Sequence, residues 1–236
     1  VPAGILAWLL AVPAYPTTYA VSPVRYTVDA IASGSALYAA HCNACHGEEG
    51  GGDGVAAALL PVKPASLPER VPSRREGDLF WWIAHGVPKT PMPGFASQLN
   101  DIEIWNLIQF LDAQAEARNA IAMTDRVKPL RPVFAPDFTF EIIGRAQESL
   151  ERQRENRVTL LVFYTLPQSL PRLRELASKQ RAILAAGARV IAVPIRESSV
   201  AGDAQIATDG ESIFAIASRN VAHAYAMFTR RAAGSN

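Results

Sequence analysis

The strongest constraint in this sequence is the five-residue segment CNACH at positions 42–46. The 236-residue chain has two cysteines, Cys42 and Cys45, and both lie in this segment, with His46 directly after the second. Four arrangements commonly use a Cys-x-x-Cys pair: a disulfide, a thiol redox pair, half of a zinc site, and covalent haem attachment. These arrangements differ in the further ligands and the flanking secondary structure that they require from the rest of the chain.

The rest of the chain favours haem attachment. A structural zinc site needs about four ligands, and no second cysteine pair is present. A thioredoxin-like redox pair follows a strand and precedes a helix, whereas here a predicted helix (29–40) precedes the motif and a glycine-rich loop follows it. A histidine placed like His46 is typical of c-type haem attachment, in which Cys42 and Cys45 would form thioethers and His46 would bind the iron.

A haem iron bound by His46 on one side takes a second axial ligand, commonly a methionine or a histidine on a downstream loop. Met92 lies in the loop TPMPGF between two prolines, which hold the backbone extended and suit a side chain that must be presented rather than packed. We therefore predict Met92 as the second ligand. Met123 and Met227 lie beyond the predicted haem domain and are expected to pack in cores.

His85 is the alternative second ligand. It precedes Gly86 at the expected end of a helix, where a histidine interacts favourably with the helix dipole without any metal. We therefore expect His85 to cap a helix.

Residues 31–117 resemble a class I cytochrome c. The matching segments are CNACH, GEEGGGDG, LPVKPASL, PMPGF and the helix DIEIWNLIQFLDAQ. The resemblance implies an all-α domain whose helices enclose one covalently bound haem c. It also implies that the first and last helices cross, and that Gly34 lets the last helix approach closely.

The resemblance also implies a haem pocket. Residues 61–67, beginning at Pro61, are expected to form the wall on the His46 side, with a backbone carbonyl accepting the imidazole N–H. One of Trp81 and Trp82 is expected to line the pocket, because adjacent helical side chains point about 100° apart. The last helix shows its own signal, an apolar repeat at helical spacing over 104–111, with Asn100 or Asp101 as its N-cap.

The composition indicates a globular chain with two modules. Hydrophobic residues make up 49% and charged residues 19%, and the net charge of +1 gives no indication of nucleic-acid binding. Acidic residues outnumber basic ones over 31–120, and the balance reverses after 121. We expect a linker at 118–133 and a second module at 134–236.

The second module is predicted to be α/β. VTLLVFY (158–164) and ARVIAVPI (188–195) are apolar runs typical of buried strands, and a predicted helix ending at Gly187 joins them, which favours a parallel β-α-β unit. A further helix is expected after 210. Because few residues follow that helix, we expect either an incomplete thioredoxin-like sheet or a polypeptide that continues beyond Asn236.

This half resembles thioredoxin-like proteins of the Sco and peroxiredoxin type. Sco-type proteins carry a Cys-Pro-x-x-Cys-Pro segment between strand and helix, whereas here Leu166 and Leu170 stand at the cysteine positions. The resemblance therefore implies a module without thiol redox chemistry, serving docking or structure. Copper binding through His223 and Met227, which are four residues apart, is an alternative. The competing interpretation is that they are an ordinary surface residue and core residue of one helix.

The complete arrangement resembles the C-terminal part of fused bacterial copper-resistance D family proteins. Residues 1–30 then form an apolar segment and an extended linker. The run GILAWLLAV (4–12) is interpreted as the end of a truncated membrane helix, a packed interfacial segment or a signal-peptide remnant. The first interpretation implies a periplasmic protein tethered to the membrane.

The predicted function is one-electron transfer to a redox partner protein. Two axial ligands leave no open iron position, so we expect no enzymatic activity. The alternatives are a haem enzyme or sensor with a labile Met92 and a copper-handling module in which the haem sets the oxidation state of copper.

Overall fold

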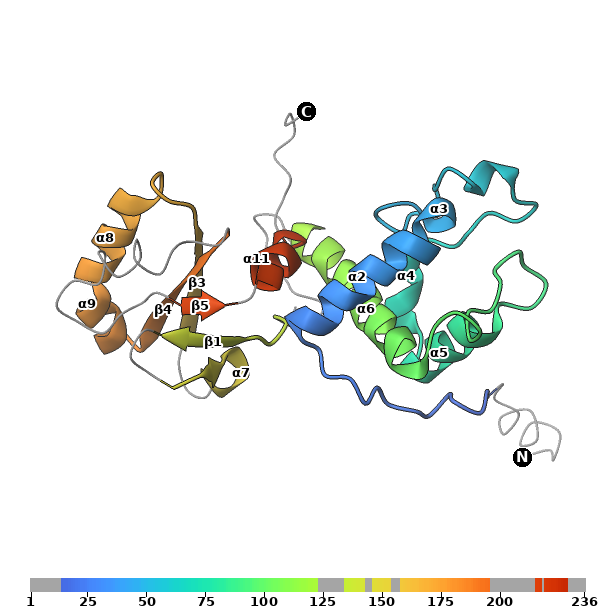
Figure 1. The fold of residues 1–236 in the computed structure, drawn as a ribbon, viewed down its shortest axis with the longest axis horizontal. Helices are drawn as coiled ribbons and strands as arrows, with labels where there is room; N and C mark the ends of the chain where they lie inside the picture. The colour runs from blue at the N-terminus through green and yellow to red at the C-terminus, as the bar shows by residue number, and fades with distance from the viewer. Residues whose placement is uncertain are drawn as a thin grey trace, which may run out of the picture. The chain divides into compact units, whose positions relative to one another are not determined.

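The computed structural model describes residues 14–122, 134–142, 146–153, 158–195, 215–217 and 219–228 (Figure 1). Its described residues fall into two compact units, one made of 14–25 with 33–122 and the other of 26–32 with the described residues from 134 onward. Helix α2 (Val28–His41) therefore contributes its first turns to the second unit. Met123, the linker 123–133 and residues 1–13 lie outside the described residues.

The first unit is all-α, as the sequence predicts. After α2 its elements are α3 (Asn43–His46), η1 (Ala57–Leu59), α4 (Leu67–Arg70), η2 (Val71–Ser73), α5 (Glu76–His85) and α6 (Asp101–Ala122). Helix α6 continues past residue 117, where we placed the end of the haem domain.

Helix α6 starts with a capping box. The Asn100 side-chain oxygen accepts the backbone N–H of Glu103 at 3.0 Å, and the Glu103 carboxylate accepts the N–H of Asn100 at 2.8 Å. The predicted apolar repeat is buried, with exposures from 0% to 6% at Ile104, Leu107, Ile108 and Leu111.

Helices α2 and α6 cross at Gly34, as expected. A Cβ at Gly34 would overlap the carbonyl of Asn106 and lie 2.7 Å from the Cβ of Phe110. One turn later Tyr38 packs its ring 5.2 Å from that of Phe110. The close approach at Gly34 therefore lets α2 pack directly on α6, the longest described helix of this unit.

The described residues of the second unit form a small α/β region with two sheets. Its elements are β1 (Thr139–Ile142), β2 (Glu148–Ser149), α7 (Leu150–Gln153), β3 (Val158–Tyr164), α8 (Leu170–Ser178), α9 (Gln180–Ala185), β4 (Ala188–Pro194), β5 (Ala215–Ala217) and α11 (Arg219–Ala226). One sheet is antiparallel in the order β2-β1-β5, and the other pairs β3 with β4 in parallel from Val158↔Ala188 to Tyr164↔Pro194. The β-α-β unit is confirmed, whereas a thioredoxin-like fold stays a prediction.

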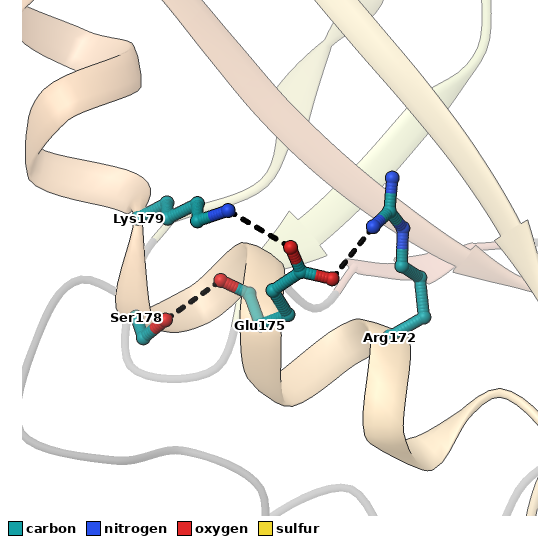
Figure 2. Close-up of polar contacts among 4 residues, drawn as sticks. All are labelled: Arg172, Glu175, Ser178 and Lys179. Atoms are coloured by element: carbon teal, nitrogen blue, oxygen red, sulfur yellow. Dashed lines mark hydrogen bonds and ion pairs between the residues drawn. The ribbon is translucent and has the colours of Figure 1, made fainter.

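Two details of this unit differ from the prediction. Strand β3 is not buried throughout, because Val158 and Leu160 at its start are 70% and 49% exposed. The predicted single helix is divided at Lys179, whose N–H is shared between the carbonyls of Glu175 and Leu176. Figure 2 shows the side chains at this break, where Glu175 binds Arg172 and Lys179 and its carbonyl accepts the Ser178 hydroxyl at 2.8 Å.

Within the described residues, no helix combines the length and the apolar character that a membrane crossing requires.

The Asp112 carboxyl, on α6, keeps its proton to an unusually high pH. Burial, followed by the negative charges of Glu76 and Glu116, raises the pKa of Asp112 to about 7. The folded protein therefore keeps a proton here that the unfolded chain releases near pH 4, so stability falls as pH rises from about 4 to about 7.

We predict that Gly34→Ala destabilises the first unit by about 2 kcal/mol, because the added methyl overlaps the Asn106 carbonyl. An unobstructed Gly→Ala change inside a helix would instead stabilise by about 1 kcal/mol. Denaturant unfolding measures the sign, and Ser33→Ala at the exposed neighbouring position is the control, with little change expected. A stabilised Gly34→Ala variant would contradict the observed crossing.

We predict that Asp112→Asn raises the free energy of unfolding by about 2 kcal/mol at pH 8 and leaves it nearly unchanged at pH 4. The destabilisation accumulates between about pH 4 and about pH 7, because there the unfolded carboxyl is ionised while the folded one keeps its proton, and asparagine removes this ionisation. Urea unfolding at both pH values measures the difference, with Glu49→Gln at an exposed loop position as the control. An equal gain at both pH values would show that the charge is not responsible.

Candidate functional site: the CNACH segment and its surroundings

Cys42 and Cys45 lie on one face of a helical turn. The N–H of Cys42 donates to the carbonyl of Tyr38 at 2.9 Å, continuing the ladder of α2. The carbonyl of Cys42 then accepts the N–H groups of Cys45 at 3.1 Å and His46 at 2.8 Å. Positions three apart on such a turn are neighbours on its surface, so both thiols can reach one group.

The imidazole of His46 is oriented by a backbone carbonyl in the predicted wall. Its Nδ1 lies 3.2 Å from the carbonyl oxygen of Ala65, within 61–67, which confirms the expected contact. A carbonyl only accepts, so Nδ1 carries the hydrogen and Nε2 presents its lone pair to a metal. Burial lowers the pKa of His46, with the bond to Ala65 acting in the opposite direction, and this favours the neutral ring that a metal requires.

The glycine-rich loop folds back over the motif. Gly52 donates its N–H to the carbonyl of His46 at 2.8 Å, and Gly54 donates to that of Cys45 at 3.2 Å. Gly52 adopts φ 76° and lies against Pro64, where a Cβ would overlap the carbonyl oxygen. Only glycine combines this φ with so close a contact, so Gly52 fixes the distance between the motif and the Ala65 segment.

Both long helices hold the same loop. Tyr38 on α2 donates its hydroxyl to the carbonyl of Gly47 at 2.6 Å, and Gln114 on α6 donates its amide to that of Glu48 at 3.0 Å. Burial, with smaller contributions from Cys42 and Asp53, raises the pKa of Tyr38, so this hydroxyl remains a donor.

The chemistry of the two thiols fits thioether formation. Burial, followed by the nearby Cys45, raises the pKa of Cys42 to about 12, so Cys42 is a neutral thiol at physiological pH. A site that binds a metal through thiolates needs the opposite shift. Uncharged thioether sulfurs suit this environment, and the apolar side chains of Val55 and Leu59 near the motif, 90% and 85% exposed, suit an apolar macrocycle.

The loop that carries Met92 is anchored to helix α5. This helix ends at His85 with Gly86 as its C-cap, as the sequence predicts. The N–H groups of Phe95 and Ala96 donate to the carbonyls of Ile83 and Ala84 at 2.9 and 3.1 Å. Met92 is half-buried, and its own N–H donates to the hydroxyl of Thr90 at 3.3 Å. Its position as iron ligand stays a prediction.

The remaining predicted pocket residues lie in different environments. Pro61 is exposed, and Trp81 and Trp82 are half-buried. Trp81 stacks on His85 with ring centroids 3.8 Å apart, and Trp82 donates its indole N–H to the hydroxyl of Tyr15 at 3.1 Å.

Sequence reasoning missed the role of residues 15–22, which we name the strap. Tyr15 stacks on Trp81 at 5.5 Å, and the Thr18 hydroxyl donates to the Asp78 carboxylate at 2.5 Å. The strap therefore packs on α5, the helix that leads to the Met92 loop. Polar threonines between tyrosines in YPTTY were the one available signal, and such a signal does not identify a partner helix.

Comparison with known proteins supports a haem site. Residues 29–111 match the family described as cytochrome c oxidase, cbb3-type, subunit III. Dihydro-heme d1 dehydrogenase from Pseudomonas aeruginosa PAO1 is 40% identical over 80 residues, which are 34% of this chain and 15% of that protein. The chain therefore spans only a small part of that relative's length.

Among solved structures, the reducing HAO-like protein complex of Kuenenia stuttgartiensis is similar over 46% of this chain and 53% of that chain, with 28% identity and a TM-score of 0.37. The family match and the sequence relative identify a cytochrome c domain around the CNACH segment. Its cofactor is haem c, bound covalently.

We predict that Gly52→Ala destabilises the protein by about 2 kcal/mol, because the methyl meets the Pro64 carbonyl in a conformation that L-residues disfavour. The variant also displaces the Ala65 carbonyl from His46. Without this hydrogen bond at Nδ1, the imidazole donates its Nε2 electron pair to iron more weakly, so the reduction potential of the haem rises. Thermal unfolding and voltammetry measure both effects. Gly51→Ala is the matched control, because there the Cβ lies 3.1 Å from the flexible Asp53 carboxylate; equal effects in both variants would contradict this role.

Proposed function

We propose that this chain is an electron carrier that works outside the cytoplasm, through one haem held by Cys42, Cys45, His46 and Met92. The observation that carries the proposal is the bond from His46 Nδ1 to Ala65, which leaves Nε2 available to iron. When bound, the haem supplies reversible one-electron chemistry at its iron.

In this proposal the protein positions the cofactor and closes both of its axial sides. Cys42 and Cys45, on one helical turn, would hold the macrocycle, and His46, oriented by Ala65, would bind the iron. Met92, on its anchored loop, would be the second protein ligand, and Pro61 and one of Trp81 and Trp82 would line the pocket. A closed coordination sphere favours electron transfer over catalysis, because no substrate can reach the iron.

The proposed location is the periplasm, with attachment to a membrane. Cytochrome c domains are typically extracytoplasmic, and the match over 29–111 supports that compartment. The apolar run 4–12 supports a tether, in line with the resemblance to fused copper-resistance D proteins.

The second unit is proposed as a thioredoxin-like module without redox chemistry, used for docking a redox partner protein or for structure. Leu166 and Leu170, at the cysteine positions of Sco-type proteins, pack against a core of Tyr164, Leu173, Val190 and Ala192. Apolar packing at this position supports a structural role.

Copper handling remains the second candidate, through His223 and Met227. His223 is exposed on α11, and Met227 lies one residue past the end of that helix. Among the described residues, no three His, Cys, Asp or Glu side chains are grouped so that they could hold a metal ion.

We predict that Met92→Ala removes the weak far-red absorption band of ferric haem with bound methionine sulfur. Loss of the thioether, which stabilises ferrous iron, also lowers the reduction potential, by an amount on the order of 0.1 V or more. Visible spectroscopy and voltammetry of the haem-loaded protein measure both.

Met227→Ala is the matched control, because it removes a half-buried methionine of the second unit. It is expected to keep both the band and the potential. A far-red band that survives in Met92→Ala would rule out Met92 as the ligand, and a wild-type protein without the band would favour the enzyme or sensor alternative.

A further inference from the structure

The strap is fixed to helix α5 through its polar side chains. The Thr17 hydroxyl donates to the carbonyl of Gly77 at 2.6 Å, and the Thr18 hydroxyl donates to Asp78. The N–H of Ser22 donates to the carboxylate of Glu76 at 3.1 Å. A Cβ at Gly77 would overlap the carbonyl of Thr17, so the two backbones touch directly. The conformation of the strap is therefore determined by its polar, inward side.

The outward side of the strap has the opposite character. Tyr19 and Val21 are 71% and 79% exposed, although Thr18 and Ser22 beside them are bound to α5. Arg75, which is exposed, places its guanidinium 4.6 Å from the centre of the Tyr19 ring. Arg74, also exposed, lies 5.5 Å from the centre of the Trp82 ring. We name Tyr19, Val21, Arg74 and Arg75 the strap face.

The charge of the strap face is positive. The acidic residues that follow in sequence, Glu76 and Asp78, are half-buried and accept hydrogen bonds from Ser22 and Thr18. Their carboxylates are thus engaged by the strap, whereas the two guanidinium groups remain accessible above the aromatic rings.

An anionic lipid surface matches this combination of groups. Tyrosine and tryptophan favour the interface between water and lipid, and arginines near an anionic membrane strengthen binding by about a factor of five each. The strap also follows the apolar run 4–12 closely in the sequence, since Val12 and Tyr15 are three residues apart. The apolar run and the strap are therefore neighbours in the sequence.

We propose that the strap face binds the headgroups of an anionic bilayer and thereby orients the cytochrome c domain on the membrane. Tyr19 and Val21 enter the headgroup layer, and Arg74 and Arg75 contact lipid phosphates. The inference rests on the proposed extracytoplasmic, membrane-attached location but is independent of the electron-transfer role.

The first test measures binding of the haem-loaded full chain to vesicles by sedimentation. Vesicles of phosphatidylcholine mixed with phosphatidylglycerol should bind the protein more strongly than phosphatidylcholine alone, and added salt should reduce the difference. The double variant Arg74→Gln/Arg75→Gln should bind the anionic vesicles about 25-fold more weakly.

The control, Arg174→Gln/Arg181→Gln, makes the same charge change at exposed positions of α8 and α9. It should leave binding nearly unchanged. Equal weakening in both double variants would attribute binding to net charge and overturn the proposal, as would equal affinity of the wild type for both kinds of vesicle.

The second test separates the strap face from the apolar run, which could bind lipid by itself. Cys42 and Cys45 are the only cysteines, so with both bound to haem, Val21→Cys provides one free thiol for an environment-sensitive dye. The dye should shift to the blue on anionic vesicles, whereas the same dye on Ser178→Cys should not.

An unshifted dye at position 21 on vesicles that bind the protein would overturn the proposal. Visible spectra recorded on the same samples show whether the haem ligands are intact, so this failure is distinguishable from a failure of the proposed electron carrier.

Discussion

The hydrogen bond from His46 Nδ1 to the Ala65 carbonyl is the interaction on which the rest of this structure depends. It fixes the tautomer of the imidazole and directs Nε2 away from the protein backbone. That bond exists because Gly52 lets the loop after the motif lie against Pro64. The close contact between Gly52 and Pro64 thus sets the orientation of the His46 imidazole, the central side chain of the haem site.

Helices α2 and α6 stabilise the contact between His46 and Ala65 indirectly, through the glycine-rich loop. The crossing at Gly34 places Tyr38 and Gln114 where they bind the glycine-rich loop from two sides. On the Met92 side, helix α5 is held by the strap, through bonds to Gly77 and Asp78. The loop that carries Met92 is bonded in turn to the end of α5. In our proposal the two residues that would bind the iron, His46 and Met92, are therefore supported by separate parts of the fold.

Local patterns in the sequence predicted much of this site. The cysteine spacing, the capping pair Asn100 and Glu103, and the glycine Gly86 each act within a few residues, so they can be recognised without a structure. The strap could not be predicted, because its partners on α5 lie about 60 residues away and its threonines resemble any polar turn. The break at Lys179 and the exposed start of β3 likewise depend on packing that apolar periodicity does not encode.

Exposure of the reduced, haem-loaded protein to carbon monoxide tests the central claim most directly, because this ligand binds ferrous haem only where an axial position is open. With His46 and Met92 both bound, the visible spectrum of the reduced protein should stay unchanged. A spectrum that converts fully to that of the carbon monoxide complex would show an open position and contradict a closed electron carrier.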